Sequence, residues 1–254
     1  MLGAGATVTT ALLSPLARAS ETSRSPVRRV MIVGSSMIVG ALGRGLGDAL
    51  TERGFEIDRR SRSASGLSRP DFHDWPKEAR AAMREFRPDA TVVMFGGNDA
   101  QGIWTRTDPK WIRFTEPAKW RVWYARRIAE FADIVTEGGQ RLVWLGAPRM
   151  GSTELDKRMR LLNSLYAQQM AIRPNGLYVP TAAALAAPNG RYARALKIGK
   201  TMVDVRTHDG VHVTMAGARR VVEFVTPAVS EFLARPRLLE APCEVGCLEP
   251  RQWR

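Results

Sequence analysis

Cysteine is scarce in this chain of 254 residues, which limits the kinds of site that the chain can build. Its only two cysteines, Cys243 and Cys247, lie close together near the C-terminus. Two cysteines are too few for a structural zinc site, so we expect either a small disulfide loop in an oxidising compartment or two free thiols. The sequence has no cluster of metal ligands and no glycine-rich phosphate loop, and we therefore predict no metal and no cofactor.

Long hydrophobic runs are also missing. Beyond the N-terminus there is no apolar stretch of about 18 residues, so we predict no transmembrane segment in the mature domain. The formal net charge is +13, but zinc-finger spacing, an RNP-like aromatic pattern and an isolated basic tail are absent, which argues against a nucleic-acid partner. The positive residues are spread along the chain, and we interpret them as a general bias that favours an anionic envelope polymer or substrate.

The N-terminus differs in composition from the rest of the chain. Residues 4–16 are small and apolar, and Ala17-Arg18-Ala19 fits the cleavage site of an export signal. No Lys or Arg precedes this run, so a disordered extension is the alternative. We predict a signal peptide or extension with a linker at residues 1–27, one domain at 28–235 and a tail at 236–254. An export signal would make the protein periplasmic or secreted, and without one it would be cytoplasmic.

Short apolar runs alternate with helical patterns along the predicted domain. We expect strands at residues 29–34, 55–60, 90–95, 141–146, 177–179 and 201–205. We expect helices at 37–53, 75–86, 120–137, 155–170 and 214–233, and a long surface loop or lid at 100–118. Strands joined by helices of this length form right-handed βαβ units. The predicted fold class is therefore α/β, a three-layer α/β/α sandwich with a mostly parallel sheet.

Polar residues follow several of these strands, at the sheet edge where open α/β sheets bind ligands. Ser36 follows the first strand, Gly66 lies after the second, and Asn98 follows the third. Asp209 and His212 precede the last helix. A serine hydroxyl becomes a nucleophile when a histidine takes its proton and a carboxylate orients that histidine. The backbone N–H groups of Ser36 and Gly66 and the amide of Asn98 would then meet the oxyanion.

In this order the motifs resemble the four blocks of the SGNH hydrolase superfamily, the GDSL-like esterases and lipases. The blocks stand here as Gly34-Ser35-Ser36, Gly66, Gly96-Gly97-Asn98-Asp99 and Asp209-Gly210-Val211-His212. The segments SASGLSRPDFHDWP, VVMFGGNDAQ, RLVWLGAPRM and MRLLNSLY look closer still to the DUF459 group of bacterial SGNH proteins. The resemblance spans residues 29 to 234 and implies a flavodoxin-like SGNH fold. It also implies a catalytic triad of Ser36, His212 and Asp209.

The resemblance implies hydrolysis of an ester through a Ser36 acyl-enzyme, on an acylated small molecule or glycan. Export would favour deacetylation of an envelope glycan. One alternative is an O-acyltransferase that passes the acyl group to a sugar hydroxyl. Another is a catalytically inactive glycan-binding protein, because Ser35 stands where the family usually has Asp. We expect the Ser35 side chain to cap the following helix in place of that Asp.

Other candidate residues lie near these blocks. His208 is an alternative base, although it misses the spacing of the fourth block, and His73 is either a pocket residue or a surface-loop histidine. Four tryptophans are predicted either to line a substrate groove or to pack in the core: Trp104, Trp111, Trp120 and Trp123.

Overall fold

The computed structural model describes residues 27–107 and 110–235. The segment predicted as an export signal, the C-terminal tail and both cysteines lie outside the described residues. Export and the redox state of Cys243 and Cys247 therefore stay predictions, as do the domain boundaries.

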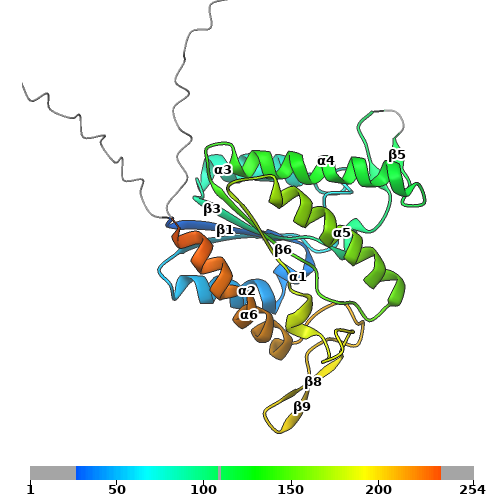
Figure 1. Ribbon diagram of the computed structural model, residues 1–254. Coiled ribbons are helices and arrows are strands. Elements are labelled where there is room, and N and C mark those ends of the chain that lie inside the picture. Colours follow the sequence, from blue (N-terminus) through cyan, green and yellow to red (C-terminus); the bar gives the residue numbers. More distant parts are fainter. Residues whose placement is uncertain (1–26, 108–109, 236–254) are drawn as a thin grey trace, which may run out of the picture.

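The central sheet has five parallel strands in the order β2-β1-β3-β6-β7 (Figure 1). These strands are β1 (Arg29–Gly34), β2 (Glu56–Ser61), β3 (Ala90–Met94), β6 (Arg141–Leu145) and β7 (Gly176–Val179). The chain leaves β1 toward β2 on one side and returns to β3 on the other side. Such a reversal of strand order opens a crevice at the carboxyl ends of the two strands.

Helices cover both faces of this sheet, which confirms the predicted three-layer α/β/α sandwich. One layer holds α3 (Trp75–Glu85), α4 (Pro117–Thr136) and α5 (Thr153–Ala171), and the other holds α2 (Ala41–Thr51) and α6 (Met215–Ala234) (Figure 1). Successive side chains of a strand point to opposite faces. Accordingly, Met31 and Val33 of β1 join the core under α3–α5, while Val30 and Ile32 join the core under α2 and α6.

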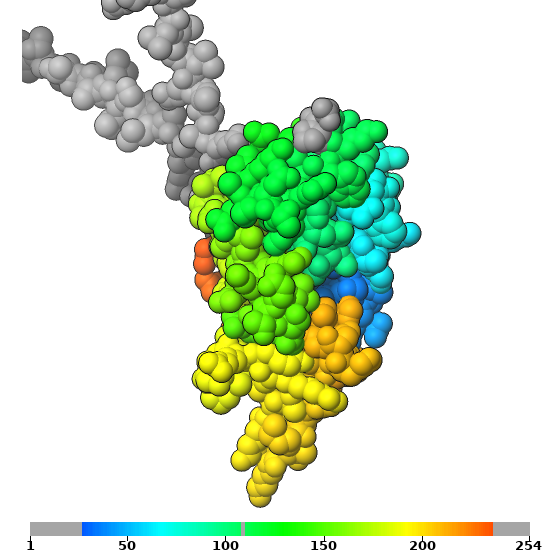
Figure 2. Space-filling view, turned by 90° about the vertical axis from the view of Figure 1, so that its right-hand side faces the viewer, coloured from blue at the N-terminus to red at the C-terminus, as the bar shows by residue number. Residues whose placement is uncertain are grey.

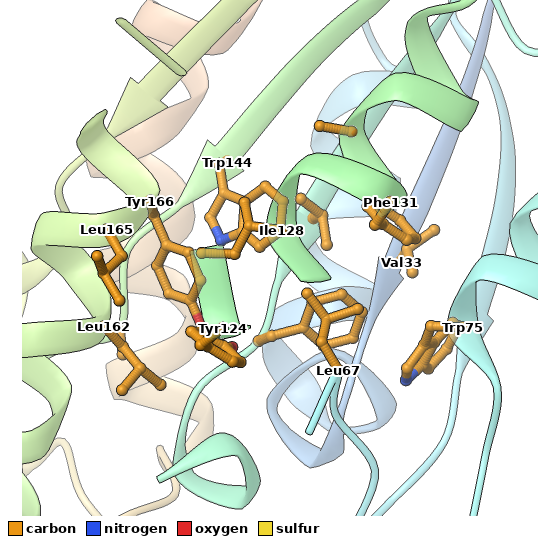
Figure 3. Packing of buried hydrophobic residues seen from close by; sticks show 14 of the residues in the cluster. Val33, Leu67, Trp75, Tyr124, Ile128, Phe131, Trp144, Leu162, Leu165 and Tyr166 are labelled. Carbon is orange, nitrogen blue, oxygen red and sulfur yellow. Dashed lines mark hydrogen bonds between the residues drawn. The ribbon is translucent and has the colours of Figure 1, made fainter. Parts of the chain in front are cut away.

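The buried aromatic side chains are concentrated in the first of these two cores (Figure 3). Trp144 of β6 stacks on Tyr166 of α5 with ring centroids 4.7 Å apart, and Phe131 of α4 meets Trp144 edge-on at 6.0 Å. Aromatic pairs in these orientations add about 0.5–1.5 kcal/mol each to the effect of burial. They fix α4 and α5 on the sheet, and with them the loops at its carboxyl edge.

Two predicted elements differ from the structure in an informative way. The predicted helix at 37–53 is split into α1 (Ser36–Val39) and α2, because Gly40 between them is extended, with φ −80° and ψ −155°. The predicted loop at 100–118 contains a hairpin of β4 (Ile103–Trp104) and β5 (Trp111–Ile112), and α4 already begins at Pro117. A 3-10 helix, η1 (Gly97–Asp99), precedes this region.

The last predicted strand does form, but it lies outside the central sheet. β9 (Thr201–Asp204) pairs antiparallel with β8 (Ala195–Ile198), and this hairpin protrudes from the body of the protein (Figure 2). Another 3-10 helix, η2 (Ala182–Leu185), lies between β7 and the hairpin.

Candidate active site

Ser36 lies at the turn where β1 ends and α1 begins. Gly34 allows this turn, because a Cβ there would come within 2.4 Å of the Met94 carbonyl oxygen of neighbouring β3. Ser35 occupies the N-cap position, but its side chain makes no capping hydrogen bond, so that prediction is wrong. The Ser35 backbone carbonyl instead accepts from the N–H groups of Ile38 (2.9 Å) and Val39 (3.1 Å), which already closes this one-turn helix.

Ser36, His212 and Asp209 form one chain of hydrogen bonds. The Ser36 Oγ lies 2.7 Å from the His212 Nε2, and the His212 Nδ1 lies 2.7 Å from the Asp209 Oδ2. Ser36 and His212 are 176 positions apart in sequence. In Figure 2 the blue segment after β1 lies beside the orange segment before α6, so the two loops meet at the carboxyl edge of the sheet. This is the arrangement in which a histidine can take the proton of a serine hydroxyl.

The loop at 206–213 presents Asp209 to His212 through several local hydrogen bonds. The Asp209 Oδ1 accepts from the Thr207 hydroxyl at 2.6 Å and from the backbone N–H groups of Val211 at 2.8 Å and His212 at 3.0 Å. Partial burial acts to raise the pKa of Asp209. The hydrogen bonds from His212, Thr207 and the backbone outweigh it and lower that pKa well below its usual range. Asp209 therefore stays a carboxylate that can orient the imidazole.

Asn98 reaches the same edge from η1, directly after β3. Its Nδ2 donates to the Ser65 carbonyl oxygen at 3.2 Å, and the Gln101 side chain donates to its backbone carbonyl at 2.5 Å. An amide nitrogen carries two hydrogens, so one of them is left for a ligand. Asn98 lines the same pocket as Ser36 and His212.

Gly66 is buried in the loop beneath Asn98. A Cβ on Gly66 would lie 2.4 Å from the Asp99 carboxylate, so only glycine lets this loop approach so closely. Gly66 is not part of the pocket lining, and its role as an oxyanion donor stays a prediction.

Asp99 is fully buried behind this loop. One carboxylate oxygen accepts from the Ser68 N–H at 2.8 Å, and the other has no hydrogen bond of good geometry to a described residue. Burial raises the pKa of Asp99 to about 7, although the Ser68 N–H and the nearby Tyr124 hydroxyl act to lower it. The Tyr124 hydroxyl in turn lies 2.8 Å from that of Tyr166, and burial raises the pKa of both phenols.

A small apolar pocket opens next to the triad. Its volume is about 200 Å³, and hydrophobic residues make up much of its wall: Met37, Phe95, Pro148, Met150, Leu155 and Val211. Sites that hold drug-sized ligands are larger, roughly 300–1,000 Å³. A cavity of this size and lining suits a short acyl group.

The remaining candidate residues do not line the pocket. His208 is exposed, and His73 packs edge-on against Trp75 with ring centroids 4.5 Å apart. Trp120 is fully buried and stacks on Tyr124, whereas Trp111 is 45% exposed. None of the four tryptophans lines the pocket described above.

Sequence reasoning missed two parts of the site. Thr207 is not among the residues predicted from the sequence, yet its hydroxyl donates to Asp209. The segment after β6, with Ala147, Pro148 and Met150, forms one pocket wall. Its position after a predicted strand was the available signal, because segments at that edge line the ligand site of an open α/β sheet.

Within residues 27–107 and 110–235 there is no grouping of three or more His, Cys, Asp or Glu side chains suited to a metal ion. Among these same residues, no helix combines the length and apolar character needed to cross a membrane.

Solved structures of other proteins share this fold. A carbohydrate esterase of family 3 from Talaromyces cellulolyticus matches with a TM-score of 0.56 at 11% identity, over 81% of this chain and 98% of that one. The periplasmic domain of a lipopolysaccharide acetyltransferase from Salmonella Paratyphi A matches with a TM-score of 0.53 at 10% identity, over 82% and 85%. Together with the sheet order, these matches define the chain as an α/β protein of the SGNH hydrolase fold.

The family follows from the sequence itself. The model of the family described as "Protein of unknown function (DUF459)" matches residues 29–228, and the chain belongs to this family. This confirms the resemblance seen in the motif segments. No curated protein matches the chain in sequence.

Proposed function

We propose that this protein is a serine esterase that cleaves short-chain acyl esters through a Ser36 acyl-enzyme. The observation that carries the proposal is the hydrogen-bond chain from Ser36 through His212 to Asp209, with 2.7 Å at each link, beside an apolar pocket. A serine and a histidine with purely structural roles would not require such a hydrogen-bond chain in the crevice at the carboxyl ends of β1 and β3.

In the first half-reaction, the Ser36 Oγ attacks the ester carbonyl carbon and its proton passes to the His212 Nε2. The carbonyl oxygen becomes an oxyanion, to which the Asn98 amide donates in this proposal. When the tetrahedral intermediate collapses, the bond to the alcohol breaks and His212 gives its proton to the leaving oxygen. Water then attacks the acyl-enzyme with His212 as base, which releases the acid and returns the proton to Ser36.

For the natural ester, we propose an acetyl or similarly short acyl group on an envelope glycan. The 200 Å³ pocket supports a short acyl group. The net charge of +13 is compatible with an anionic glycan. Relatives in fold include a carbohydrate esterase and a lipopolysaccharide acetyltransferase domain, and these names suggest glycans as the first alcohols to test.

Acyl transfer is the second candidate function, and the exposure of the triad to solvent supports it. The side chains of His212 and Asp209 are 41% and 38% exposed, so an acceptor alcohol can reach the base from solvent. In this reaction a sugar hydroxyl replaces water in the second half-reaction. A labelled acyl-enzyme offered increasing glycan acceptor would show the transfer as label in the glycan at the expense of free acid.

A panel of p-nitrophenyl esters from acetyl to decanoyl tests the proposal directly. We expect activity on the acetyl and butyryl esters, a fall of at least about tenfold at decanoyl, and near-complete loss in Ser36→Ala. The melting temperature of Ser36→Ala should stay near that of the wild type, because this serine lies at the sheet edge.

Ser164→Ala provides the matched control, since Ser164 is an exposed serine of α5 far along the chain from the triad. A fluorophosphonate should label Ser36 and leave Ser164 unmodified. Retention of more than a few per cent of activity in Ser36→Ala would remove this serine as the nucleophile and the esterase proposal with it.

A further inference from the structure

Arg206 is a buried arginine that forms no ion pair with a carboxylate among residues 27–107 and 110–235. Its side chain is 1% exposed, and it is among the largest fully buried side chains in the described residues. The guanidinium donates to three backbone carbonyl oxygens, those of Arg149 at 2.8 Å, Gly210 at 3.2 Å and Val211 at 2.5 Å. Burial lowers the pKa of Arg206. Burying an unpaired cation is costly, so a role beyond filling space is worth seeking.

The three carbonyls belong to two different walls of the proposed active site. Gly210 and Val211 are the two residues between Asp209 and His212. Arg149 lies in the segment after β6, where Ala147, Pro148 and Met150 line the pocket. The planar fork of a guanidinium can hold several acceptors at set angles, which an ammonium group cannot do. Arg206 therefore joins the loop of the base to the wall of the pocket.

Neighbouring contacts hold the same junction in place. The Gly151 N–H donates to the Gly210 carbonyl at 2.9 Å, and Gly210 has the positive φ of +68° that favours glycine. The Tyr192 ring lies over the Arg206 guanidinium at 5.5 Å. These contacts leave the peptides on both sides of Val211 little freedom to turn, and those peptides set the direction of the His212 imidazole.

We propose that Arg206 is a positioning residue that aims His212 at Ser36 and sets the width of the acyl pocket. Arg206 does not contact the proposed nucleophile, so it acts through the backbone of two loops and through its 3.4 Å contact with the Met150 sulfur. The inference rests on the proposed esterase function for its kinetic consequences, but its geometric part concerns the His212–Asp209 contact alone. Misplacement of a catalytic group by about 1 Å can cost 10²-fold in rate.

Arg141 provides a matched control within the same chain. It is also buried, at 4% exposure, and its guanidinium also donates to backbone carbonyls, those of Phe232 (2.8 Å), Leu233 and Arg235. It lies at the first residue of β6, whereas the site lies beyond the carboxyl end of that strand. Loss of either arginine removes a buried cation and leaves backbone carbonyls without their hydrogen-bond donor. Of the two, it is Arg206 whose hydrogen bonds reach the active-site loops.

The kinetic test compares Arg206→Met, Arg206→Lys and Arg141→Met on the p-nitrophenyl ester panel. For Arg206→Met we expect kcat to fall about 10²-fold with a small change in KM, and the preference for acetyl over butyryl ester to change. Arg206→Lys keeps the charge without the fork and should recover little of this loss. Arg141→Met should lose melting temperature but keep kcat within about twofold. Equal losses of kcat in the two methionine variants would overturn the proposal.

The second readout does not depend on an ester substrate. In wild-type protein the proton between the His212 Nδ1 and Asp209 should give a strongly deshielded ¹H NMR signal, which Arg206→Lys and Arg206→Met should weaken or shift and Arg141→Met should retain. An unchanged signal in both Arg206 variants would also overturn the proposal. If wild-type protein cleaves no ester, the proposed function fails, and this signal still decides the role of Arg206. If Arg206→Met does not fold, the comparison of Arg206→Lys with wild-type protein decides the role of Arg206.

Discussion

Two short regions at the same sheet edge each carry an aspartate, and the pKa values of these two aspartates are shifted in opposite directions. In the turn after β3, Asp99 is fully buried and its pKa is raised to about 7. In the loop before α6, the Asp209 side chain is 38% exposed and its pKa lies below the usual range. The two carboxyl groups are chemically identical, so the difference comes entirely from their surroundings.

Burial and hydrogen-bond donors explain the contrast. One oxygen of Asp99 has the Ser68 N–H as its donor and the other has no partner of good geometry, so burial dominates. Asp209 has donors from Thr207, from two backbone N–H groups and from His212, with solvent nearby. The surroundings of Asp99 thus favour the protonated carboxyl group, while those of Asp209 favour the carboxylate. A similar division between two carboxyl groups occurs in known enzymes.

The largest expected effect comes from Asp209→Asn. The amide keeps the shape of the side chain but favours the wrong tautomer of His212, so we expect kcat to fall by about 10⁴ with the melting temperature little changed. Steady-state kinetics on short-chain esters measure this loss. A decrease below about tenfold would indicate that Asp209 only organises the loop, and the contrast between the two aspartates would lose its functional meaning.

Asp99→Asn should have the next largest effect, on stability instead of rate. Between about pH 4 and 7 the folded protein keeps a proton on Asp99 that the unfolded chain has released, so stability falls as pH rises through this range. With a pKa of about 7 in the folded protein, the whole transition corresponds to roughly 4 kcal/mol, of which about 2.5–3 kcal/mol falls between pH 5 and pH 8. An asparagine cannot ionise and still offers an oxygen to the Ser68 N–H, so the variant should lose this pH dependence.

Urea unfolding at pH 5 and pH 8 measures the effect as a difference between variant and wild type. Asp48→Asn is the control, because Asp48 is an exposed residue of α2 and its removal should leave the pH dependence in place. If Asp99→Asn keeps the same slope as the wild type, Asp99 is ionised in the folded protein and the contrast with Asp209 is wrong.

Asn98→Ala tests whether the amide of Asn98, in the turn after β3, stabilises the oxyanion. Because an oxyanion exists only in the transition state and intermediates, loss of the amide should lower kcat far more than it raises KM. We expect a loss of about 10²–10³ in kcat, or roughly 2.7–4 kcal/mol. Asn98→Asp should be at least as damaging, since it places a carboxylate where negative charge develops. Unchanged kcat in folded Asn98→Ala would show that Asn98 only shapes its turn.

Thr207→Val should have the smallest effect, and it tests how much one hydrogen-bond donor contributes to the low pKa of Asp209. It removes one donor from Asp209 and leaves the two backbone donors, so the pKa of Asp209 should move up toward its usual value. We expect kcat to fall about fivefold to tenfold at neutral pH. Thr207→Ser retains the hydroxyl and should retain the rate. Equal rates in the valine and serine variants would mean that the backbone donors suffice.

Much of the fold was predictable from local sequence. The apolar runs of β1, β3 and β6 and the helical spacing of Leu42, Leu46 and Leu50 specify buried strands and an amphipathic helix. The order of the four motif blocks also predicted which residues meet at the sheet edge. The structure brings Ser36, His212 and Asp209 together as that order predicted. The strands and helices were predictable because periodicity is a property of neighbouring residues, whereas the triad was predicted from the resemblance to the SGNH hydrolases.

Local sequence was less informative where distant segments decide the outcome. Gly40 broke a pattern that otherwise predicts one continuous helix, and Ser35 stood at an N-cap position without acting as a cap. Both residues lie in the short connection between β1 and α2, which is closely packed: a Cβ on Gly34 would meet the Met94 carbonyl, and a Cβ on Gly43 would meet the Ile38 carbonyl. Residue preferences of a few tenths to about 1 kcal/mol are easily outweighed by such packing.

The sequence by itself determined the α/β alternation, the apolar strand faces and the candidate nucleophile, base and acid. Only the tertiary structure decided that Arg206 is buried between two loops and that Asp99 and Asp209 differ in protonation. In sequence, Arg206 is one of many cations, and the place of Asp99 in a motif block says nothing of its burial. The reason is physical: strand and helix patterns depend on neighbours in the chain, whereas desolvation depends on which distant elements close around a group.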